Sequence, residues 1–398
     1  MKIPTMRAVV SAMICLAMLT GCWNSRELDE LGIAVATGID KNDQGEYLIT
    51  VQVINPSEVA TEAPTTRPPV STYTITGETL FEAFRKLSIK TPRKIYLSQM
   101  RLVVIGESLA EDGIMPALDF LYRDHEFRPS YYITVAKNAS VENILSVLTP
   151  YEKIPANKVM NSIENAESHW GVTTGVHIDT LISKIRSPGE EAVLGGLLLN
   201  GEEDVGNRMS NVEQADAPTT LELDETAVFK EDRLAGWLTE KQSLGFNFIT
   251  GEVSSTIVTH PCENGETSSV ELLRSTSSIT AEMDGDTPSI SVLIEAEGNI
   301  GEMNCDISIG EPEGIDQINL ALEEEIETIV QSAIVAAQSD FESDIFGFGQ
   351  AVHRYEKNDW KTLESEWDEV FKDVRVQVDV KAEVRSRGNS SRQIDKKG

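Results

Sequence analysis

The sequence has few positive charges and few cysteines. Its 398 residues include 34 lysines and arginines against 65 aspartates and glutamates, which gives a formal net charge of −31. Because such a chain repels phosphate groups, this balance argues against a nucleic-acid-binding protein and against a polybasic grip on anionic lipid. Four cysteines in this length are too few for a fold framed by disulfides. The apolar share of 40% is that of an ordinary folded protein, and the length allows about two or three domains.

The sequence also lacks the common catalytic and cofactor motifs. It contains no H-E-x-x-H or C-x-x-C pattern, no phosphate-binding loop and no G-x-S-x-G nucleophile elbow. His169 and His177 are eight residues apart, a spacing that makes a poor pair of metal ligands. The sequence therefore predicts a protein that is not an enzyme and that holds no cofactor or metal.

The first 22 residues predict the signal peptide of a lipoprotein. Lys2 and Arg7 supply positive charge, and the mostly apolar run 8–19 is shorter than the roughly 20 residues that a membrane span needs. Leu19-Thr20-Gly21-Cys22 is similar to the lipobox of bacterial lipoproteins, whose cysteine receives diacylglycerol and palmitate. Two or three acyl chains hold a protein at a membrane, whereas one chain is marginal. We therefore expect cleavage after residue 21 and attachment to membrane lipid through Cys22.

Residues 22–150 are expected to form an N-terminal α+β domain, because strand and helix patterns alternate there at short intervals. The predicted elements are a hairpin of 31–39 with 47–53, strands at 102–105 and 131–135, and helices over 80–91 and 115–121. Residues 151–218 are expected to form a mainly helical middle domain and linker, with one strand at 192–199.

Residues 219–387 predict a C-terminal α+β domain, a mostly antiparallel sheet packed with a long helix. Strands are expected at 221–229, 252–259, 268–279 and 289–297. Apolar residues then recur every three or four positions over 315–341, which predicts a helix with one buried face. Valines alternate with polar residues over 374–384, which predicts a half-buried strand. Residues 388–398 have no core-forming side chains and are expected to be a disordered tail, so that the fold class is α+β in three mixed domains.

The densest charged cluster is Arg123-Asp124-His125-Glu126-Phe127-Arg128-Pro129, which falls between a predicted helix and a predicted strand. One interpretation is a structural loop whose arginines bind helix-terminal carbonyls and neighbouring carboxylates. The other is a loop that contacts a partner through Arg123, Asp124, Glu126 and Arg128.

Two cysteines, Cys262 and Cys305, remain once the signal peptide is removed and Cys22 is acylated. Both lie beside predicted strands of one domain, outside the membrane, where a disulfide can persist. A disulfide and a pair of buried free thiols are both compatible with the sequence.

Short motifs in a fixed order extend over more than three hundred residues of the chain. They are Gly21-Cys22-Trp23-Asn24, Arg26-Glu27-Leu28, Gly38-Ile39-Asp40, Val51-Gln52-Val53, Pro92-Arg93-Lys94, Val104-Ile105-Gly106-Glu107, Asp119-Phe120, Arg123-Asp124, Phe127-Arg128-Pro129, Pro150-Tyr151-Glu152-Lys153-Ile154-Pro155, Ala227-Val228-Phe229, Gly236-Trp237-Leu238 and Phe348-Gly349-Gln350-Ala351. Through these motifs the chain resembles the Ger(x)C family, the C-subunit lipoproteins of spore germinant receptors. His125 is a departure, since proline is frequent there in the family.

The resemblance implies a non-enzymatic subunit on the outer face of the inner spore membrane, needed for nutrient-triggered germination. It implies an A subunit and a polytopic, transporter-like B subunit as partners, and three α+β domains. The alternative function is a lipid-anchored solute-binding protein of an uptake system, which should show two similar α/β lobes.

Overall fold

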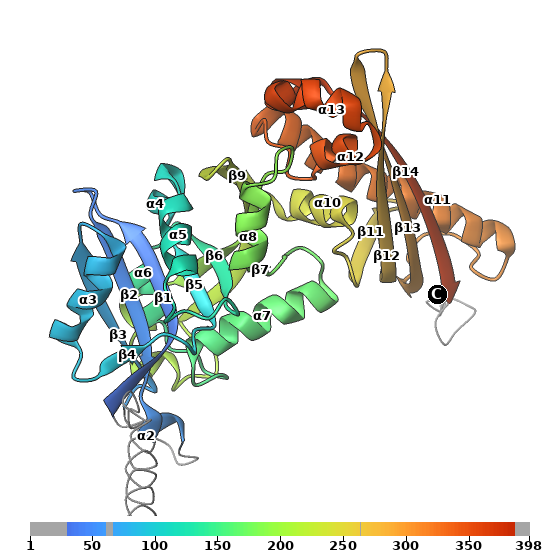
Figure 1. Ribbon diagram of the computed structural model, residues 1–398. Coiled ribbons are helices and arrows are strands. Elements are labelled where there is room, and N and C mark those ends of the chain that lie inside the picture. Colours follow the sequence, from blue (N-terminus) through green and yellow to red (C-terminus); the bar gives the residue numbers. More distant parts are fainter. Residues whose placement is uncertain (1–29, 61–66, 263, 387–398) are drawn as a thin grey trace, which may run out of the picture.

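Two β-sheets organise the chain, and the computed structural model describes residues 30–60, 67–262 and 264–386 (Figure 1). The strands are β1 (Leu31–Lys41), β2 (Tyr47–Ile54), β3 (Val70–Gly77), β4 (Lys94–Tyr96), β5 (Leu102–Ile105), β6 (Tyr132–Lys137), β7 (Val176–His177), β8 (Val193–Gly201), β9 (Thr219–Lys230), β10 (Arg233–Leu238), β11 (Thr256–Pro261), β12 (Thr267–Asp284), β13 (Thr287–Glu302) and β14 (Arg375–Ser386).

The helices connect and cover these strands. They are α2 (Pro56–Val59), α3 (Leu80–Lys90), α4 (Glu107–Asp112), α5 (Met115–Arg123), α6 (Val141–Ser146), α7 (Pro155–His169), α8 (Ile178–Ile185), α9 (Glu203–Gly206), α10 (Glu240–Thr250), α11 (Pro312–Val335), α12 (Phe348–Tyr355), α13 (Lys357–Leu363) and α14 (Trp367–Asp373), with the short turns η2 (Met209–Asn211), η3 (Ala336–Asp340) and η4 (Glu364–Glu366).

The first sheet follows the order β10-β9-β8-β6-β5-β1-β2-β3, with β4 paired to β1 and β7 paired to β6. Its centre is parallel, because β1, β5, β6 and β8 run in the same direction. Helices α3, α5 and α8 cover one face, and α6 and α7 cover the other. Val103 and Ile105 of β5 therefore enter one core cluster, and Leu102 and Val104 enter the other. Burial on both faces explains why these strands are almost continuously apolar.

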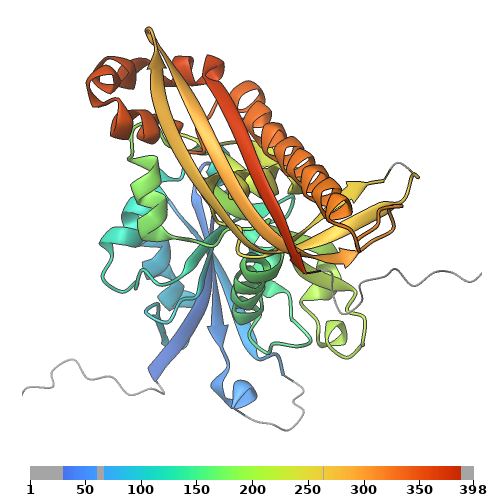
Figure 2. The same ribbon diagram turned by 90° about the vertical axis from the view of Figure 1, so that its right-hand side faces the viewer.

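The second sheet has the order β11-β12-β13-β14, and only the β13–β14 pair is parallel. Figure 2 shows the long helix α11 lying along these strands. Ile318, Leu322 and Ile326 of α11 are completely buried, as the spacing of apolar residues predicted. A mixed α+β architecture that contains a mostly antiparallel sheet and a long C-terminal helix is therefore confirmed.

The sheets divide the chain at a different point from the boundary expected at residue 218. The strand expected over 221–229 forms as β9, but it pairs with β8 of the first sheet, with Gly201 opposite Thr219. The change of sheet falls after β10, across α10. The strand expected over 252–259 begins only at Thr256, because Gly251 ends α10 in a left-handed conformation. The division into three domains stays a prediction.

The buried residue Asp344 binds the C-terminal helices through its carboxylate and contacts the first-sheet half through its backbone carbonyl. It accepts hydrogen bonds from the backbone N–H groups of Phe348 (3.0 Å) and Gly349 (2.8 Å) and from Nε1 of Trp367 (2.9 Å). The carbonyl oxygen of Asp344 accepts from the N–H of Glu191, just before β8, at 2.8 Å. One residue therefore caps α12, holds α14 and contacts the chain that leads into β8.

Two close contacts complete this junction. The hydroxyl of Ser343 donates to the carbonyl of Phe229 in β9 at 2.7 Å. Gly349 lies against Gly189 so closely that a Cβ at position 349 would be 2.5 Å from the Gly189 Cα.

Burial raises the pKa of Asp344 from 3.8 to about 6, although its N–H donors favour the charged form.

Asp344→Asn should destabilise the protein by about 1–3 kcal/mol. Both carboxylate oxygens of Asp344 accept hydrogen bonds from N–H groups, and in asparagine an NH₂ group would replace one of these oxygens and face an N–H donor. Because its pKa is raised in the folded protein, Asp344 holds a proton more tightly there than in the unfolded chain. The resulting stabilisation is complete below about pH 4 and is lost as the pH rises through about 6. The deficit of the variant should therefore be about 1 kcal/mol larger at pH 5 than at pH 7.5, measured by urea unfolding. Exposed Asp368→Asn is the control. An equal Asp344→Asn deficit at both pH values would contradict the raised pKa.

Cys262 and Cys305 form a disulfide in the structure, with their Cα atoms 5.1 Å apart. The bond joins the turn after β11 to the segment after β13. It spans 43 positions of sequence.

Replacing both cysteines by serine should lower the free energy of unfolding by about 4 kcal/mol, because the unfolded chain loses a covalently closed loop. Urea unfolding with and without a thiol reductant measures this effect. The reductant should destabilise the wild-type protein and leave the double variant unchanged. A wild-type protein that is indifferent to the reductant would show that the thiols are free.

Candidate functional site

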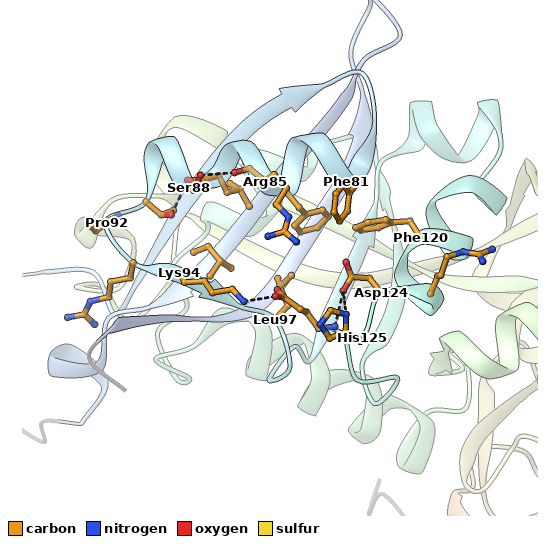
Figure 3. A pocket seen from close by; sticks show the side chains of 16 residues that line it. Phe81, Arg85, Ser88, Pro92, Lys94, Leu97, Phe120, Asp124 and His125 are labelled. Atoms are coloured by element: carbon orange, nitrogen blue, oxygen red, sulfur yellow. Dashed lines mark hydrogen bonds and ion pairs between the residues drawn. The ribbon is translucent and has the colours of Figure 1, made fainter. Parts of the chain in front are cut away.

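A groove with a volume of about 700 Å³ opens on the first-sheet half of the molecule, and we call it the α3 groove (Figure 3). Its apolar lining residues are Phe81, Phe84, Leu87, Ile95, Leu97 and Phe120, and its charged or ionisable ones are Arg85, Arg93, Lys94, Arg123, Asp124, His125 and Glu126. Figure 3 shows Phe81, Arg85 and Ser88 along one wall, with Lys94 and Leu97 opposite.

Helix α3 forms the first wall, and its ends are set by local sequence. The Thr79 side chain accepts a hydrogen bond from the N–H of Glu82 and caps the start of the helix. The helix ends at Lys90, because Thr91 precedes a proline and adopts an extended conformation. Side chains four positions apart then share the outer face, and two of them, Phe81 and Ile89, are 53% and 82% exposed.

Three phenylalanines hold the charged loop after α5 against α3. Phe84 of α3 stacks on Phe120 of α5 with ring centroids 5.4 Å apart. Phe127, buried in the loop, meets both rings edge-on at 5.5 Å and 5.9 Å. Such pairs each contribute roughly 0.5–1.5 kcal/mol beyond their buried area, so the loop has a defined position relative to α3.

The charged side chains of the loop are also held in place. Glu126 forms an ion pair with Lys94 of β4, with Oε1 and Nζ 2.5 Å apart, and its backbone N–H donates to the Asp124 carboxylate at 2.8 Å. Arg123 binds the Asp119 carboxylate one turn earlier in α5, at 2.6 Å and 3.2 Å. This contact lowers the pKa of Asp119 and raises that of Arg123.

The structure thus brings together three of the four residues predicted for a partner-contact loop. Arg123, Asp124 and Glu126 line the α3 groove, whereas Arg128 is exposed outside the lining. Arg123 binds a neighbouring carboxylate, that of Asp119, and the role of the loop as a partner contact stays a prediction. Cys22 lies outside the described residues, and the Cys262–Cys305 disulfide belongs to the second sheet.

Sequence reasoning assigned no role to Arg85, Arg93 or Lys94, although Arg93 and Lys94 are part of a family motif. A signal for them was present. Residues 83–106 contain six lysines and arginines and no aspartate or glutamate, within a chain that has almost twice as many acids as bases.

The lining of the groove combines apolar side chains with charged ones. Its two hydroxyls donate to backbone carbonyls, that of Ser88 to Arg85 at 2.8 Å and that of Thr91 to Leu87 at 2.9 Å. The His125 side chain is 91% exposed, with Nδ1 3.8 Å from Oδ1 of Asp124. An apolar floor with a few charged groups at the rim is typical of a ligand or partner site. Across the described residues, no cluster of three or more His, Cys, Asp or Glu side chains could hold a metal ion. The same part of the chain has no helix that is both long and apolar enough to cross a membrane.

Comparison with known proteins finds relatives along almost the whole chain. The N-terminal domain model of spore germination proteins matches residues 24–197, and the model described as "Spore germination B3/GerAC like, C-terminal" matches residues 224–388. Spore germination protein KC of Bacillus subtilis (strain 168) is 31% identical over 387 residues, which cover 95% of this chain and 94% of that protein. Spore germination protein YndF of the same strain is 25% identical, covering 95% and 96%.

A solved structure, the crystal structure of the GerBC protein, shares the fold. The two structures superpose with a TM-score of 0.54 at 16% identity, over 87% of this chain and 96% of that one. With the sequence matches, this similarity confirms the resemblance drawn from the motifs: the chain belongs to the GerAC-like family of spore germination proteins.

Proposed function

We propose that this chain is a non-enzymatic, lipid-anchored subunit of a spore germinant receptor. It acts in nutrient-triggered germination through contacts with the A and B membrane subunits, on the outer face of the inner spore membrane. One structural observation carries the proposal: the α3 groove lies beside the start of β1, the first strand of the described residues. Leu31, the first residue of β1, pairs with Lys94 of the groove.

The position of the groove matters because the predicted anchor lies shortly before β1 in the sequence. Cys22 precedes Leu31 by nine residues, so the connecting segment can reach at most about 30 Å. An acylated Cys22 therefore holds the α3 groove close to the membrane surface. This raises the effective concentration of the groove and its charged loop at membrane partners.

The architecture supports a receptor subunit over a solute-binding protein. A binding protein of an uptake system needs two similar lobes that close on a ligand. Here one half is a mixed sheet with a parallel centre, and the other is a four-stranded, mostly antiparallel sheet. Hydrogen bonds from Glu191 to the Asp344 carbonyl and from Ser343 to the Phe229 carbonyl join the halves, which leaves little freedom for a hinge.

Cys22→Ala should abolish acylation and release the protein from the membrane. Fractionation of spores, combined with metabolic labelling by a fatty acid, measures both effects. Cys305→Ser serves as a control for loss of a cysteine as such, and it should leave labelling and membrane attachment intact. Firm attachment of unlabelled Cys22→Ala protein would contradict the anchor.

Arg123→Glu/Arg128→Glu should leave the fold and acylation intact, because both side chains are exposed. It should lower the amount of A and B subunits that copurify by roughly tenfold or more, as expected for arginines in an interface, and slow germination in nutrient. Lys357→Glu/Lys361→Glu makes the same change of charge on exposed residues of α13 and is the matched control. Normal copurification of the arginine variant would show that the partners bind elsewhere.

A further inference from the structure

The charge around the α3 groove differs in sign from that of the whole chain. The acid-free stretch 83–106 supplies three of the groove's cations, Arg85, Arg93 and Lys94. Charges beyond about 10 Å are largely screened at physiological salt, so a ligand at the groove responds to its immediate surroundings. The net charge of −31 therefore does not exclude an anionic ligand here.

Two guanidinium groups of the groove are available to an anion. Arg85 lies over the Phe81 ring, with its guanidinium carbon 5.0 Å from the ring centroid, and Arg93 is exposed. Within residues 30–60, 67–262 and 264–386, no carboxylate forms an ion pair with either arginine. Lys94, in contrast, is already paired with Glu126. Guanidinium groups suit phosphate, which they can bind through two parallel hydrogen bonds.

The same wall of the groove exposes apolar side chains. Phe81, Arg85 and Ile89 lie at intervals of four residues on the outer face of α3. The side chains of Phe81 and Ile89 are exposed. Inside the groove, Phe84, Leu87 and Phe120 continue the apolar surface. A helix face that combines exposed apolar side chains with cations is typical of a segment that lies at a lipid headgroup region.

We infer that the α3 groove binds an anionic phospholipid of the membrane to which the chain is anchored. The phosphate lies between Arg85 and Arg93, and the acyl part lies against Phe81 and the phenylalanine floor. The inference goes beyond the receptor function and depends on the proposed anchor only for proximity, through the pairing of Leu31 with Lys94. That proximity, with unpaired guanidinium groups beside an exposed phenylalanine and isoleucine, favours a lipid over an acidic protein segment.

The test uses the unacylated mature chain, residues 22–398 with Cys22→Ala, so that no acyl group contributes to binding. Its hydrophobic cores are built from residues 34–384 and are retained. In flotation assays it should bind vesicles of phosphatidylcholine that contain phosphatidylglycerol, and bind vesicles of phosphatidylcholine alone at least tenfold more weakly. Added salt should weaken the binding.

Arg85→Glu/Arg93→Glu should reduce binding to the anionic vesicles by about tenfold or more, since each basic residue near an anionic surface contributes measurably to affinity. Ile89→Ser should reduce it several-fold through the loss of apolar contact. Lys357→Glu/Lys361→Glu alters the net charge equally and should bind like the parent chain. All of these side chains are exposed, and unchanged urea unfolding confirms that each variant is folded.

Three results would overturn the inference: equal binding to both kinds of vesicle, full binding by the arginine variant, or an equal loss in the lysine control. If Arg85→Glu/Arg93→Glu keeps its lipid binding but no longer copurifies with the A and B subunits, the groove binds a protein segment instead. The vesicle assays need neither acylation nor partners, so their failure is distinct from failure of the proposed receptor function.

Discussion

Strand β1 is the constraint on which the rest of the structure depends. It pairs with β2, β4 and β5, and residues 34–39 are buried on both faces. A strand in this position cannot shift by one residue without moving buried side chains to the wrong face. The same strand places the α3 groove beside the start of the described chain, because Leu31 pairs with Lys94.

Patterns of burial made most individual strands predictable, but not their partners. The continuous apolar run of β1 reflects burial on both faces of the sheet, and the alternating valines of β14 reflect burial on one face. Pairing depends on packing between distant segments, so β9 could not be assigned to the first sheet from its own residues. Helix α10 escaped prediction because residues 243–249 are all buried, which leaves no polar face to reveal the helical period. Its caps, Thr239 and Gly251, were the readable signals.

The sequence indicated only one side of the candidate site, the charged loop. The charged loop stood out because its residues are adjacent, whereas the opposite wall combines Arg85 with residues that the chain brings in from elsewhere. A whole-chain charge also averages over surfaces that never act together. Counting charge along the sequence would have found the acid-free stretch 83–106, but only the fold shows that its arginines meet Phe120 and the loop after α5.

Under the proposed acylation of Cys22, nine positions separate the anchor from β1, which would limit the distance of the body from the membrane but leave its orientation free. A second contact removes that freedom. In Figure 1 the start of β1 and the second sheet lie at opposite ends of the molecule. With the α3 groove on lipid, the second sheet and helices α12–α14 would project away from the membrane. Buried hydrogen bonds at Ser343 and Asp344 join the two halves, so an orientation set at the groove would be transmitted to the whole body. On the proposed anchor and the inferred lipid contact, the junction around Asp344 and the α3 groove would together present a defined face of the body to the membrane.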